Sequence, residues 1–517
     1  MLRWTFVCIA LFACVVWAES PRPVRITIRA AAPARTMQGG IGASWHAIDT
    51  ELPSHQPNSD DSYSGSAWGG NPDPDDTAAW RELYTHAEWL GLDWMRVELE
   101  QESYEPHLRE FTWDSRDMRA LYRILDWAES HHVDVFLQQM FDDVDWNAYP
   151  GLENDPVGRL RSAARSIPEF AYGLGELVSH LTRDKGYTCI RWLSINNEPG
   201  WDEFSWWQDS NLKATVPIAP AFAAVRAELD SRGIKLPISG PDWTDLPKLD
   251  PAKLDFEPSL GAIDLHSYTA VFDDMDTKDG YPLREADQRL AEWARYAHDR
   301  GKPLFLSELG TMGFGWGRRH AGPGSYNSGL KDASLVIRGL NAGVDGFNRW
   351  SFVNRGDLDG QWQLIDTWDA DANRLLKEFK PHLCSYFMYG LLARFIALHS
   401  GVLETRVEPA SAEKERKFVA AALRSPKGAL TLCMVNEADR DADVTVVLDG
   451  LAAVTTLYKY AITPADRDRS DLSIRPLKDY KLRPGAATIH ERIPGSSITV
   501  YSSYRLKPGE PGIMAEK

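Results

Sequence analysis

The chain has 517 residues, a formal net charge of −17 and a charged fraction of 25%. That length is too great for one small domain and suits a large domain with a smaller one appended. An acidic surface repels phosphate backbones, so we do not expect nucleic acid as a partner. The 20 tryptophans are more than usual and suit either a large core or stacking against sugar rings.

The N-terminus is typical of a secretory signal peptide. Arg3 supplies a positive charge, residues 4–16 are almost wholly apolar, and residues 16–18 offer a cleavage site. The apolar run is too short for a transmembrane helix, and no later segment is long and apolar enough to span a bilayer. We therefore expect a secreted or periplasmic protein. A lipid anchor on Cys14, in a loose match to a lipoprotein box, is the alternative.

The next region, residues 39–398, alternates short apolar runs with amphipathic helical stretches. Such runs are typical of buried parallel strands, and eight β/α alternations close into a (β/α)8 TIM barrel of the α/β class. The interval after the fifth run is the least regular. The eight runs are Gly40–Trp45, Trp94–Leu99, Val133–Gln139, Ile190–Ile195, Leu236–Ser239, Ala262–His266, Leu304–Ser307 and Gly346–Trp350.

Beyond about Gly401 the runs become shorter, richer in β-branched residues and separated by turn residues. This pattern predicts a C-terminal antiparallel β-sandwich domain. Val24–Arg29 is also strand-like, and we expect it to pair into the sandwich. The predicted division is a signal peptide at 1–18, the N-terminal strand segment at 19–38, the catalytic barrel at 39–398, the sandwich at 399–510 and a tail at 511–517.

The cysteines and the acidic loop predict neither a metal site nor a disulfide framework. Without the signal peptide three scattered cysteines remain, and we expect buried free thiols, with a single bridge as the alternative. The aspartates of the first long loop do not follow EF-hand spacing and predict a solvated acidic loop. We expect no cofactor. The residues concerned are Cys189, Cys384, Cys433, Asp60, Asp61, Asp73, Asp75 and Asp76.

Two of the predicted strands end on a glutamate. Glu198 follows the fourth run and Glu308 follows the seventh. The carboxyl ends of parallel barrel strands meet at one rim, where active sites are built. A pair of carboxyl groups across that rim is the minimum equipment for cleaving a glycosidic bond. Helix capping or pairing with an arginine is the alternative role for each glutamate.

These motifs resemble clan A, the large clan of retaining (β/α)8 glycoside hydrolases. The resemblance rests on Asn197-Glu198-Pro199 after strand four and Ser307-Glu308 at strand seven. The layout, with a sandwich built from the C-terminus, looks most like families 39, 30 and 5. The resemblance implies that Glu198 is the acid/base and Glu308 the nucleophile, and that no cofactor is needed.

Further residues match the clan pattern and are expected to bind substrate or support the glutamates. Asn197 matches the asparagine that binds the sugar 2-hydroxyl, and Tyr268 could donate to Glu308. Arg96 could hold Glu308 ionised, or it could belong to an ion network along its own strand. His266 is expected to touch substrate or Glu198. The alternative for each is ordinary structural packing.

Tryptophans and polar residues near other strand ends complete the expected substrate-binding set. Trp350 is expected to form the floor beneath the sugar ring, with barrel packing as its alternative. The others lie where clan members contact sugar, or else belong to core or solvated loop. They are Trp45, His46, Gln139, Asp142 and Trp362.

The sequence therefore predicts a secreted retaining glycoside hydrolase that acts on an oligosaccharide, a polysaccharide or a glycoconjugate. Two other functions use the same barrel. One is a carbohydrate-binding barrel without turnover, and the other is a transglycosylase that transfers the glycosyl group to a second sugar.

Overall fold

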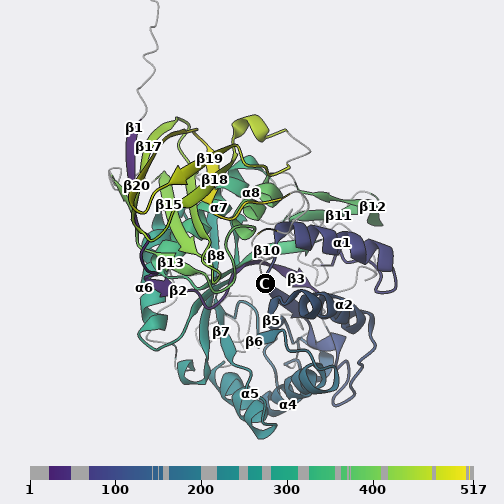
Figure 1. The fold of residues 1–517 in the computed structure, drawn as a ribbon. Coiled ribbons are helices and arrows are strands. Elements are labelled where there is room, and N and C mark those ends of the chain that lie inside the picture. The colour runs from purple at the N-terminus through teal and green to yellow at the C-terminus, as the bar shows by residue number, and fades with distance from the viewer. Residues whose placement is uncertain are drawn as a thin grey trace, which may run out of the picture.

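The computed structural model describes residues 22–47, 69–142, 144–149, 151–154, 162–199, 218–243, 254, 256–270, 281–312, 325–354, 362–369, 372, 374–382, 384–408, 417–468, 473–507 and 512. The predicted signal peptide and the residues Asp60 and Asp61 of the acidic loop lie outside this part of the chain. Figure 1 shows a barrel with its helices and, beside it, a group of strands that forms the sandwich.

Eight parallel strands close the barrel, as predicted. Each strand pairs with the next in chain order, and the last pairs with the first. The fifth to eighth strands each run several residues further than their apolar runs. The strands are β3 (Ile41–His46), β4 (Trp94–Leu99), β5 (Asp134–Gln139), β6 (Ile190–Ser194), β7 (Ile238–Trp243), β8 (Ala262–Ala270), β9 (Leu304–Met312) and β10 (Gly346–Asn354).

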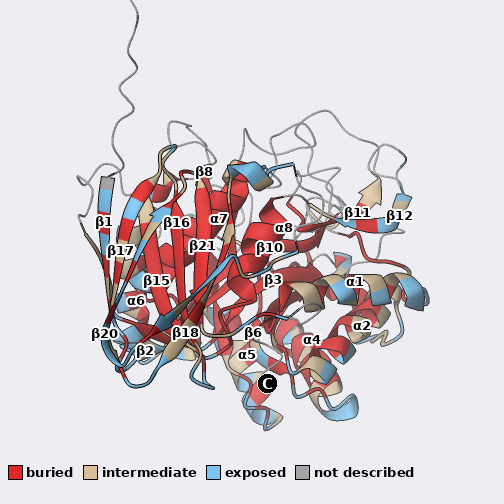
Figure 2. Cartoon of the chain, turned by 45° about the horizontal axis from the view of Figure 1, so that its top comes forward, coloured by how far each residue is buried: buried red, intermediate tan, exposed pale blue. Residues whose placement is uncertain are grey.

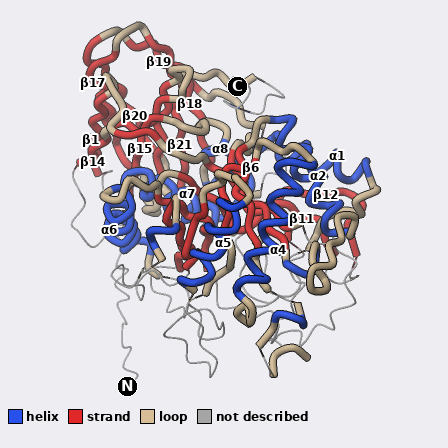
Figure 3. Tube along the Cα trace, turned by 90° about the horizontal axis from the view of Figure 1, so that it is seen from below, coloured by secondary structure: helices blue, strands red, loops and turns tan. Residues whose placement is uncertain are grey.

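Helices cover the outside of the barrel, as Figure 3 shows from below. They are α1 (Thr77–Leu90), α2 (Arg116–His131), α4 (Ile167–Ser179), α5 (Ala219–Ser231), α6 (Ala286–His298), α7 (Tyr326–Ala342) and α8 (Ser385–Ala393). The ends of α1 follow from its sequence. The Asp76 side chain accepts from two backbone amides at its start, and Gly91 ends it in the left-handed conformation. Between β7 and β8 the described residues form only the short turn Glu257–Ser259.

Aromatic and aliphatic side chains fill the lower end of the barrel interior, which is the end where the strands begin. Trp94, Phe136 and Phe305 are fully buried and form one cluster with Ala262 and Leu398. The ring centroids of Trp94 and Phe305 are 5.0 Å apart. This packing leaves the C-terminal end of the barrel as the place for polar side chains.

A hairpin that the apolar pattern did not predict extends the barrel sheet. β11 (Ile365–Asp369) pairs parallel to β10, and β12 (Arg374–Pro381) pairs antiparallel to β11. Most residues of β12 are exposed or half-buried, so the strand has no apolar run to mark it.

The C-terminal region forms two sheets that face each other. One has the order β14-β1-β17-β20 and the other β19-β18-β21-β16-β15-β13-β2. The bounds are β1 (Arg22–Arg29), β2 (Arg35–Thr36), β13 (Gly401–Leu403), β14 (Thr405–Glu408), β15 (Phe418–Arg424), β16 (Leu430–Asn436), β17 (Ala442–Leu451), β18 (Thr455–Ile462), β19 (Lys478–Leu482), β20 (Gly485–Ile493) and β21 (Ser497–Ser502).

The segment Val24–Arg29 lies in β1, which inserts between β14 and β17. β1 is antiparallel to β14 but parallel to β17, so the sandwich contains a parallel pair among its antiparallel ones. In Figure 1 this strand is the purple one beside the strands of the C-terminal region. The segment before the barrel and the segment after it therefore build one sheet together.

Helix α7 lies between the barrel and the sandwich, and its Arg338 donates to Glu437 at the end of β16. Figure 2 shows buried residues along the central strands and exposed residues on the outer faces of the helices. The three cysteines of the described chain are free and buried, as predicted. Among the described residues there is no helix with the length and hydropathy needed to cross a membrane.

Candidate active site

The two glutamates predicted from the sequence lie together at the C-terminal end of the barrel. Glu308 is on β9 and is almost fully buried, and Glu198 follows β6 and is more accessible, with a side chain that is 13% exposed. Together with His266 of β8 they each place one side-chain oxygen or nitrogen within 4.8 Å of the other two. The barrel therefore brings together carboxyl groups that are 110 positions apart in the chain.

The backbone at Glu198 has a left-handed conformation, with φ of 43°. A residue with a Cβ pays roughly 1–3 kcal/mol for such a conformation, and such residues concentrate at functional sites. The Glu198 amide donates to the backbone oxygen of Asp242, at 3.1 Å. This bond ties the end of β6 to the end of β7 and helps to hold the Glu198 side chain over the barrel.

Arg96 of β4 is the central cation of the site and is fully buried. Its guanidinium donates to the carboxylates of Glu98, Glu308 and Asp242. Burial alone would lower the pKa of Arg96, but these three carboxylates raise it above its usual value. Arg96 therefore contacts Glu308 and also Glu98 on its own strand.

Asn197 joins the same network through its side-chain oxygen. Arg96 Nη2 donates to Asn197 Oδ1 at 2.9 Å. Because a guanidinium can only donate, the oxygen of the amide must face Arg96, which fixes the orientation of the amide group. The Asn197 nitrogen is then the donor end of the side chain.

Tyr268 and His266, two residues apart on β8, reach the glutamates from one face of the strand. Tyr268 donates its hydroxyl to Glu308 Oε2 at 2.5 Å. His266 Nδ1 lies 2.6 Å from Glu198 Oε1 and 3.2 Å from Glu308 Oε2. The expected contacts from Tyr268 to Glu308 and from His266 to Glu198 are both present in the structure.

The carboxyl group of Glu308 experiences opposing influences. Burial raises its pKa to about 7, and the negative charge of Glu198 acts in the same direction, whereas His266 and Arg96 lower it. Burial likewise raises the pKa of Tyr268, and the nearby Glu308 raises it further, so the phenol stays protonated and donates. The cationic and hydrogen-bonding groups around Glu308 therefore oppose the rise that burial causes, without outweighing it.

Two tryptophans and a histidine border this cluster. Trp350 lies with its ring centroid 5.9 Å from the Arg96 guanidinium carbon and 4.7 Å from the His46 ring. His46 Nε2 is 2.7 Å from Glu98 Oε2. Trp362 packs edge-to-face on Tyr268. These aromatic side chains are placed next to the carboxyl groups that the sequence predicted.

Trp45 was expected to bind substrate, and the structure places it elsewhere. Its side chain points to the helix-facing side of β3, where its ring packs against Trp80 of α1 and Trp127 of α2. Its indole nitrogen donates to Asn71. Trp45 is a core residue because neighbouring residues of a strand point to opposite faces, and His46 takes the inward position.

Gln139 and Asp142 form a separate polar pair. Gln139 Nε2 donates to Asp142 Oδ1 at 2.7 Å, and Gln139 Oε1 accepts from Tyr104. Gln138, one residue earlier, takes the inward position on β5 and donates to Asp242. Gln139 was expected to line the site, and the structure places its neighbour Gln138 against the cluster instead.

Asp242, at the end of β7, is a member of the cluster that sequence reasoning missed. It is fully buried and accepts from Arg96, His266, Ser307 and Gln138. Burial would raise its pKa, but Arg96 and His266 lower it below the usual range. Burial and the charge of Asp242 raise the pKa of its neighbour Asp264 to about 8, although hydrogen bonds from Ser239 and from the Asp242 amide act in the opposite direction.

The cluster of Glu198, His266 and Glu308 is close enough for a cation to bridge it. The positive charge that these carboxylates need is already supplied, because Arg96 pairs with Glu308 and His266 contacts both glutamates. The donor set therefore fits proton transfer better than metal binding.

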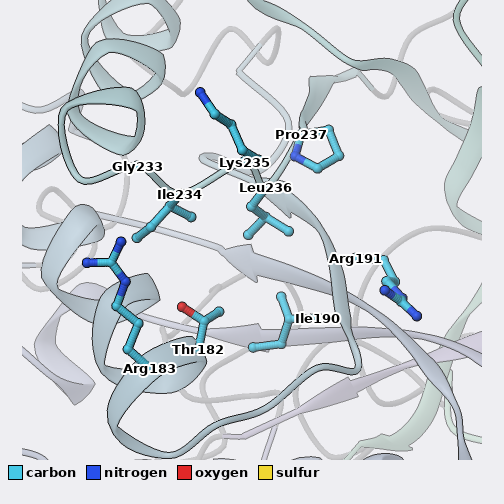
Figure 4. Close-up of a pocket in the computed structure, with 9 residues that line it drawn as sticks. All are labelled: Thr182, Arg183, Ile190, Arg191, Gly233, Ile234, Lys235, Leu236 and Pro237. Carbon is cyan, nitrogen blue, oxygen red and sulfur yellow. The ribbon is translucent and has the colours of Figure 1, made fainter.

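A separate hollow of about 370 Å³ lies at the opposite end of the barrel (Figure 4). It is formed by Ile190 and Arg191 at the start of β6, by the segment Gly233–Pro237 before β7, and by Thr182 and Arg183. Its lining contains no carboxyl group, so it offers no equipment for acid–base chemistry.

Comparison with known proteins agrees with this geometry. A family model described as Cellulase (glycosyl hydrolase family 5) matches residues 55–323. No curated protein matches the sequence. Among solved structures, the catalytic domain of GH30 xylanase C from Talaromyces cellulolyticus is 13% identical, with a TM-score of 0.58 over 92% of this chain and 99% of that one.

Two further structures have the same fold. A conserved exported protein from Bacteroides fragilis is 12% identical, with a TM-score of 0.64 over 92% of this chain and 99% of that one. SrfJ from Salmonella typhimurium is 15% identical, with a TM-score of 0.60 over 95% and 94% of the two chains. The family model covers more than half of the 517 residues, and the chain therefore belongs to the cellulase family, glycosyl hydrolase family 5, and is a retaining O-glycosyl hydrolase of clan A.

Proposed function

We propose that this enzyme is an exported glycosidase that cleaves an oligosaccharide, a polysaccharide or a glycoconjugate by double displacement. Glu308 is the nucleophile and Glu198 the acid/base. The observation that carries the proposal is the approach of the two carboxyl groups, whose oxygens come within 4.8 Å of each other. Retaining enzymes hold their carboxyl groups about 5–5.5 Å apart, whereas inverting enzymes need about 6.5–9.5 Å for a water molecule.

The surroundings of the glutamates support this division of roles. Glu308 accepts hydrogen bonds from Arg96 and Tyr268, both of which stabilise a negative charge. Glu198 is the more accessible of the two and contacts His266, a side chain that can take up and return a proton. An ionised group suits attack on a sugar, and an exchangeable proton suits an acid that later acts as a base.

The first step joins Glu308 to the sugar. A carboxylate oxygen of Glu308 attacks the anomeric carbon, the bond from that carbon to the leaving oxygen breaks, and the leaving oxygen takes the proton of Glu198. In the second step Glu198 removes a proton from water, the water oxygen bonds to the anomeric carbon, and the bond to Glu308 breaks. Enzyme and protonation states return to their starting point.

The sugar is proposed to lie over Trp350, with Asn197 donating to its 2-hydroxyl. His46 and Trp362 border the same space, through their contacts with Trp350 and Tyr268. Trp45 is left out of this set because it packs under the helices. The solved structures with this fold are named as xylanases, as a glucosidase, as an iduronidase orthologue and as an endo-β1,6-glucanase, so a panel of sugars is needed to find the substrate.

Replacing Glu198 by alanine tests the acid/base role. Loss of the acid should lower turnover of a glycoside with a poor leaving group, such as phenol, by about 10²–10⁴-fold. Glycosides of the same sugar with 2,4-dinitrophenol need no protonation, so their first step should be much less affected. Steady-state and burst kinetics on both glycosides measure the difference, and an equal loss on both would make Glu198 a structural residue.

The same panel separates the two other functions of such a barrel. Chromatography of the products shows longer oligosaccharides if the glycosyl group is transferred to a second sugar. Sugar binding without release of any aryl group indicates a barrel that binds and does not cleave. Export is tested separately by N-terminal sequencing of the mature protein, which should begin at Glu19 after removal of the predicted signal peptide.

A further inference from the structure

Asp242 is a buried carboxylate that the two-step reaction does not use directly, although it touches most of the groups that do. Its Oδ1 accepts from His266 Nε2 at 2.9 Å and from Ser307 Oγ at 2.6 Å. Its Oδ2 accepts from Arg96 Nη2 at 3.0 Å and from Gln138 Nε2. Both oxygens are thus surrounded by donors, and the side chain is fully buried.

We propose that Asp242 is a positioning residue that selects the tautomer of His266, so that Nδ1 is the nitrogen that exchanges a proton with Glu198. This inference rests on the proposed role of Glu198 as acid/base. An ionised carboxylate can only accept hydrogen bonds, so His266 Nε2 must carry a proton to bond with Asp242. In the neutral ring the other nitrogen, Nδ1, then has a lone pair that points at Glu198 Oε1, 2.6 Å away.

Fixing the proton on Nε2 gives the pair of His266 and Glu198 two states with the same number of protons. In one, protonated Glu198 donates to the lone pair of a neutral ring. In the other, the O–H bond of Glu198 has broken, an N–H bond has formed at Nδ1, and a carboxylate faces an imidazolium. Only the first state can protonate the leaving oxygen in the first step. The pair then holds one proton fewer, with a Glu198 carboxylate beside a neutral ring, until Glu198 takes a proton from water in the second step.

Other charged groups around His266 favour Glu198 as the partner of Nδ1. Glu308 Oε2 is further from Nδ1, at 3.2 Å, and already accepts from Tyr268. Arg96 acts on the ring through Asp242, and Asp264 lies two residues earlier on the same strand. Burial would lower the pKa of His266, but Glu308 and Asp242 raise it well above the usual value, so a proton on Nδ1 is accessible to the folded protein.

The substitution Asp242→Asn reverses the tautomer while preserving shape. Because Arg96 and Gln138 both donate to the Oδ2 side, the amide oxygen must stay there and the amide nitrogen must replace Oδ1. That nitrogen donates to Nε2, which then has to be the bare nitrogen of a neutral ring. The ring proton moves to Nδ1, where it is donated to Glu198 and favours its ionised form.

The expected result is a selective loss of acid catalysis. For phenyl and 2,4-dinitrophenyl glycosides of one sugar, Asp242→Asn should lower kcat/KM on the phenyl glycoside by about 100-fold and on the dinitrophenyl glycoside by less than about tenfold. The basic limb of the pH profile reports loss of the Glu198 proton, so it should move to lower pH. Equal losses on the two glycosides with an unmoved basic limb would overturn the inference.

A matched control is Asp332→Asn. Asp332 is also buried and accepts from an arginine, Arg349, and from Thr311, but those contacts are on α7, β10 and β9 and do not include His266. The Asp332→Asn variant should have lower stability, but the ratio of its kcat/KM values on the phenyl and dinitrophenyl glycosides should be unchanged. The Glu198→Ala variant is measured beside them. If that variant shows no dependence on the leaving group, the proposed function fails. If Glu198→Ala depends on the leaving group and Asp242→Asn does not, only the role of Asp242 fails.

A measurement on the unaltered enzyme covers the case in which Asp242→Asn does not fold. Nitrogen-15 NMR of histidine-labelled protein distinguishes the two ring nitrogens, and the His266→Gln variant identifies the signal. We expect a protonated Nε2 throughout the pH range in which the ring is neutral. A bare Nε2 with a protonated Nδ1 in that range would overturn the inference.

Discussion

The two ends of the barrel interior are built by the same strands with opposite chemistry. At the lower end the inward side chains are Trp94, Phe136 and Phe305. Two or three positions further along, the same strands supply Arg96, Gln138, Ser307 and Glu308. Because every second residue of a strand points to the same face, a change of two positions exchanges an aromatic ring for a charge.

This difference shows how the aromatic end supports the polar end. The packed rings exclude water from beneath the charged cluster, and electrostatic interactions are stronger where water is excluded. The same exclusion raises the pKa of Glu308, through burial. The charged groups compensate one another, since Arg96 contacts three carboxylates and His266 a further one. Variants at the polar end should therefore lose turnover, whereas variants at the aromatic end should mainly lose stability.

The largest effect is expected at the polar end, from removal of the proposed nucleophile. Glu308→Ala should lose on the order of 10⁴-fold or more of its turnover. Added azide can occupy the space of the carboxylate, attack the anomeric carbon from the same side and restore reaction, with an inverted glycosyl azide as product. Aryl glycoside kinetics with product identification by NMR measure both effects. Full turnover without azide would remove Glu308 from the mechanism.

A matched control for this variant is Glu437→Gln. Glu437 is also a glutamate with a largely covered side chain, 6% exposed, that accepts from an arginine, but its side-chain contacts are with Lys331, Ser334 and Arg338 of α7 and not with residues proposed for the site. Its turnover should be retained, and any loss should appear in thermal stability.

The second prediction compares the two ends directly, with Arg96→Met and Phe305→Ala. Removing Arg96 leaves buried carboxylates without their cation, which costs about 3–5 kcal/mol of unfolding free energy. Removing the Phe305 ring leaves a cavity and costs a similar amount, about 3–5 kcal/mol. Only Arg96→Met should also abolish turnover and raise the pKa of Glu308. Denaturant unfolding and pH profiles measure both. A Phe305→Ala variant that lost turnover as completely as Arg96→Met would contradict this difference between the two ends.

Much of this arrangement could be predicted from the sequence. Apolar runs mark the barrel strands because a parallel strand is buried on both faces. The glutamates at the ends of the fourth and seventh runs, with Arg96, Asn197 and His266-x-Tyr268, converge because strand ends meet at one rim. Local sequence patterns were therefore enough to locate these six residues of the cluster.

The residues that were missed or misplaced depend on features that local patterns do not specify. Asp242 follows Gly240-Pro241, and a proline inside a run argues against a strand, so the predicted strand ended at Ser239. Trp45 and Gln139 were each one position away from the inward side chain, and a shift of one residue exchanges the two faces of a strand. Which face is inward is decided by packing against helices such as α1, and not by the strand alone.

The smallest effect is expected from Tyr268→Phe, which removes the hydroxyl that donates to Glu308. Glu308 must be ionised to attack, so activity is lost as the pH falls through its pKa, which burial raises to about 7. The Tyr268 hydroxyl stabilises the ionised form, and its removal should raise that pKa by about one to two units, because a hydrogen bond to a charged group contributes about 1.5–3 kcal/mol. The acid limb of kcat/KM should therefore move to higher pH.

Tyr281→Phe is the control, since its buried hydroxyl bonds to Ser267 and not to Glu308, and its acid limb should stay in place. A limb that moves equally in both variants would show that the shift reflects general loosening of β8, and a limb that moves in neither would mean that Tyr268 does not set the charge of Glu308.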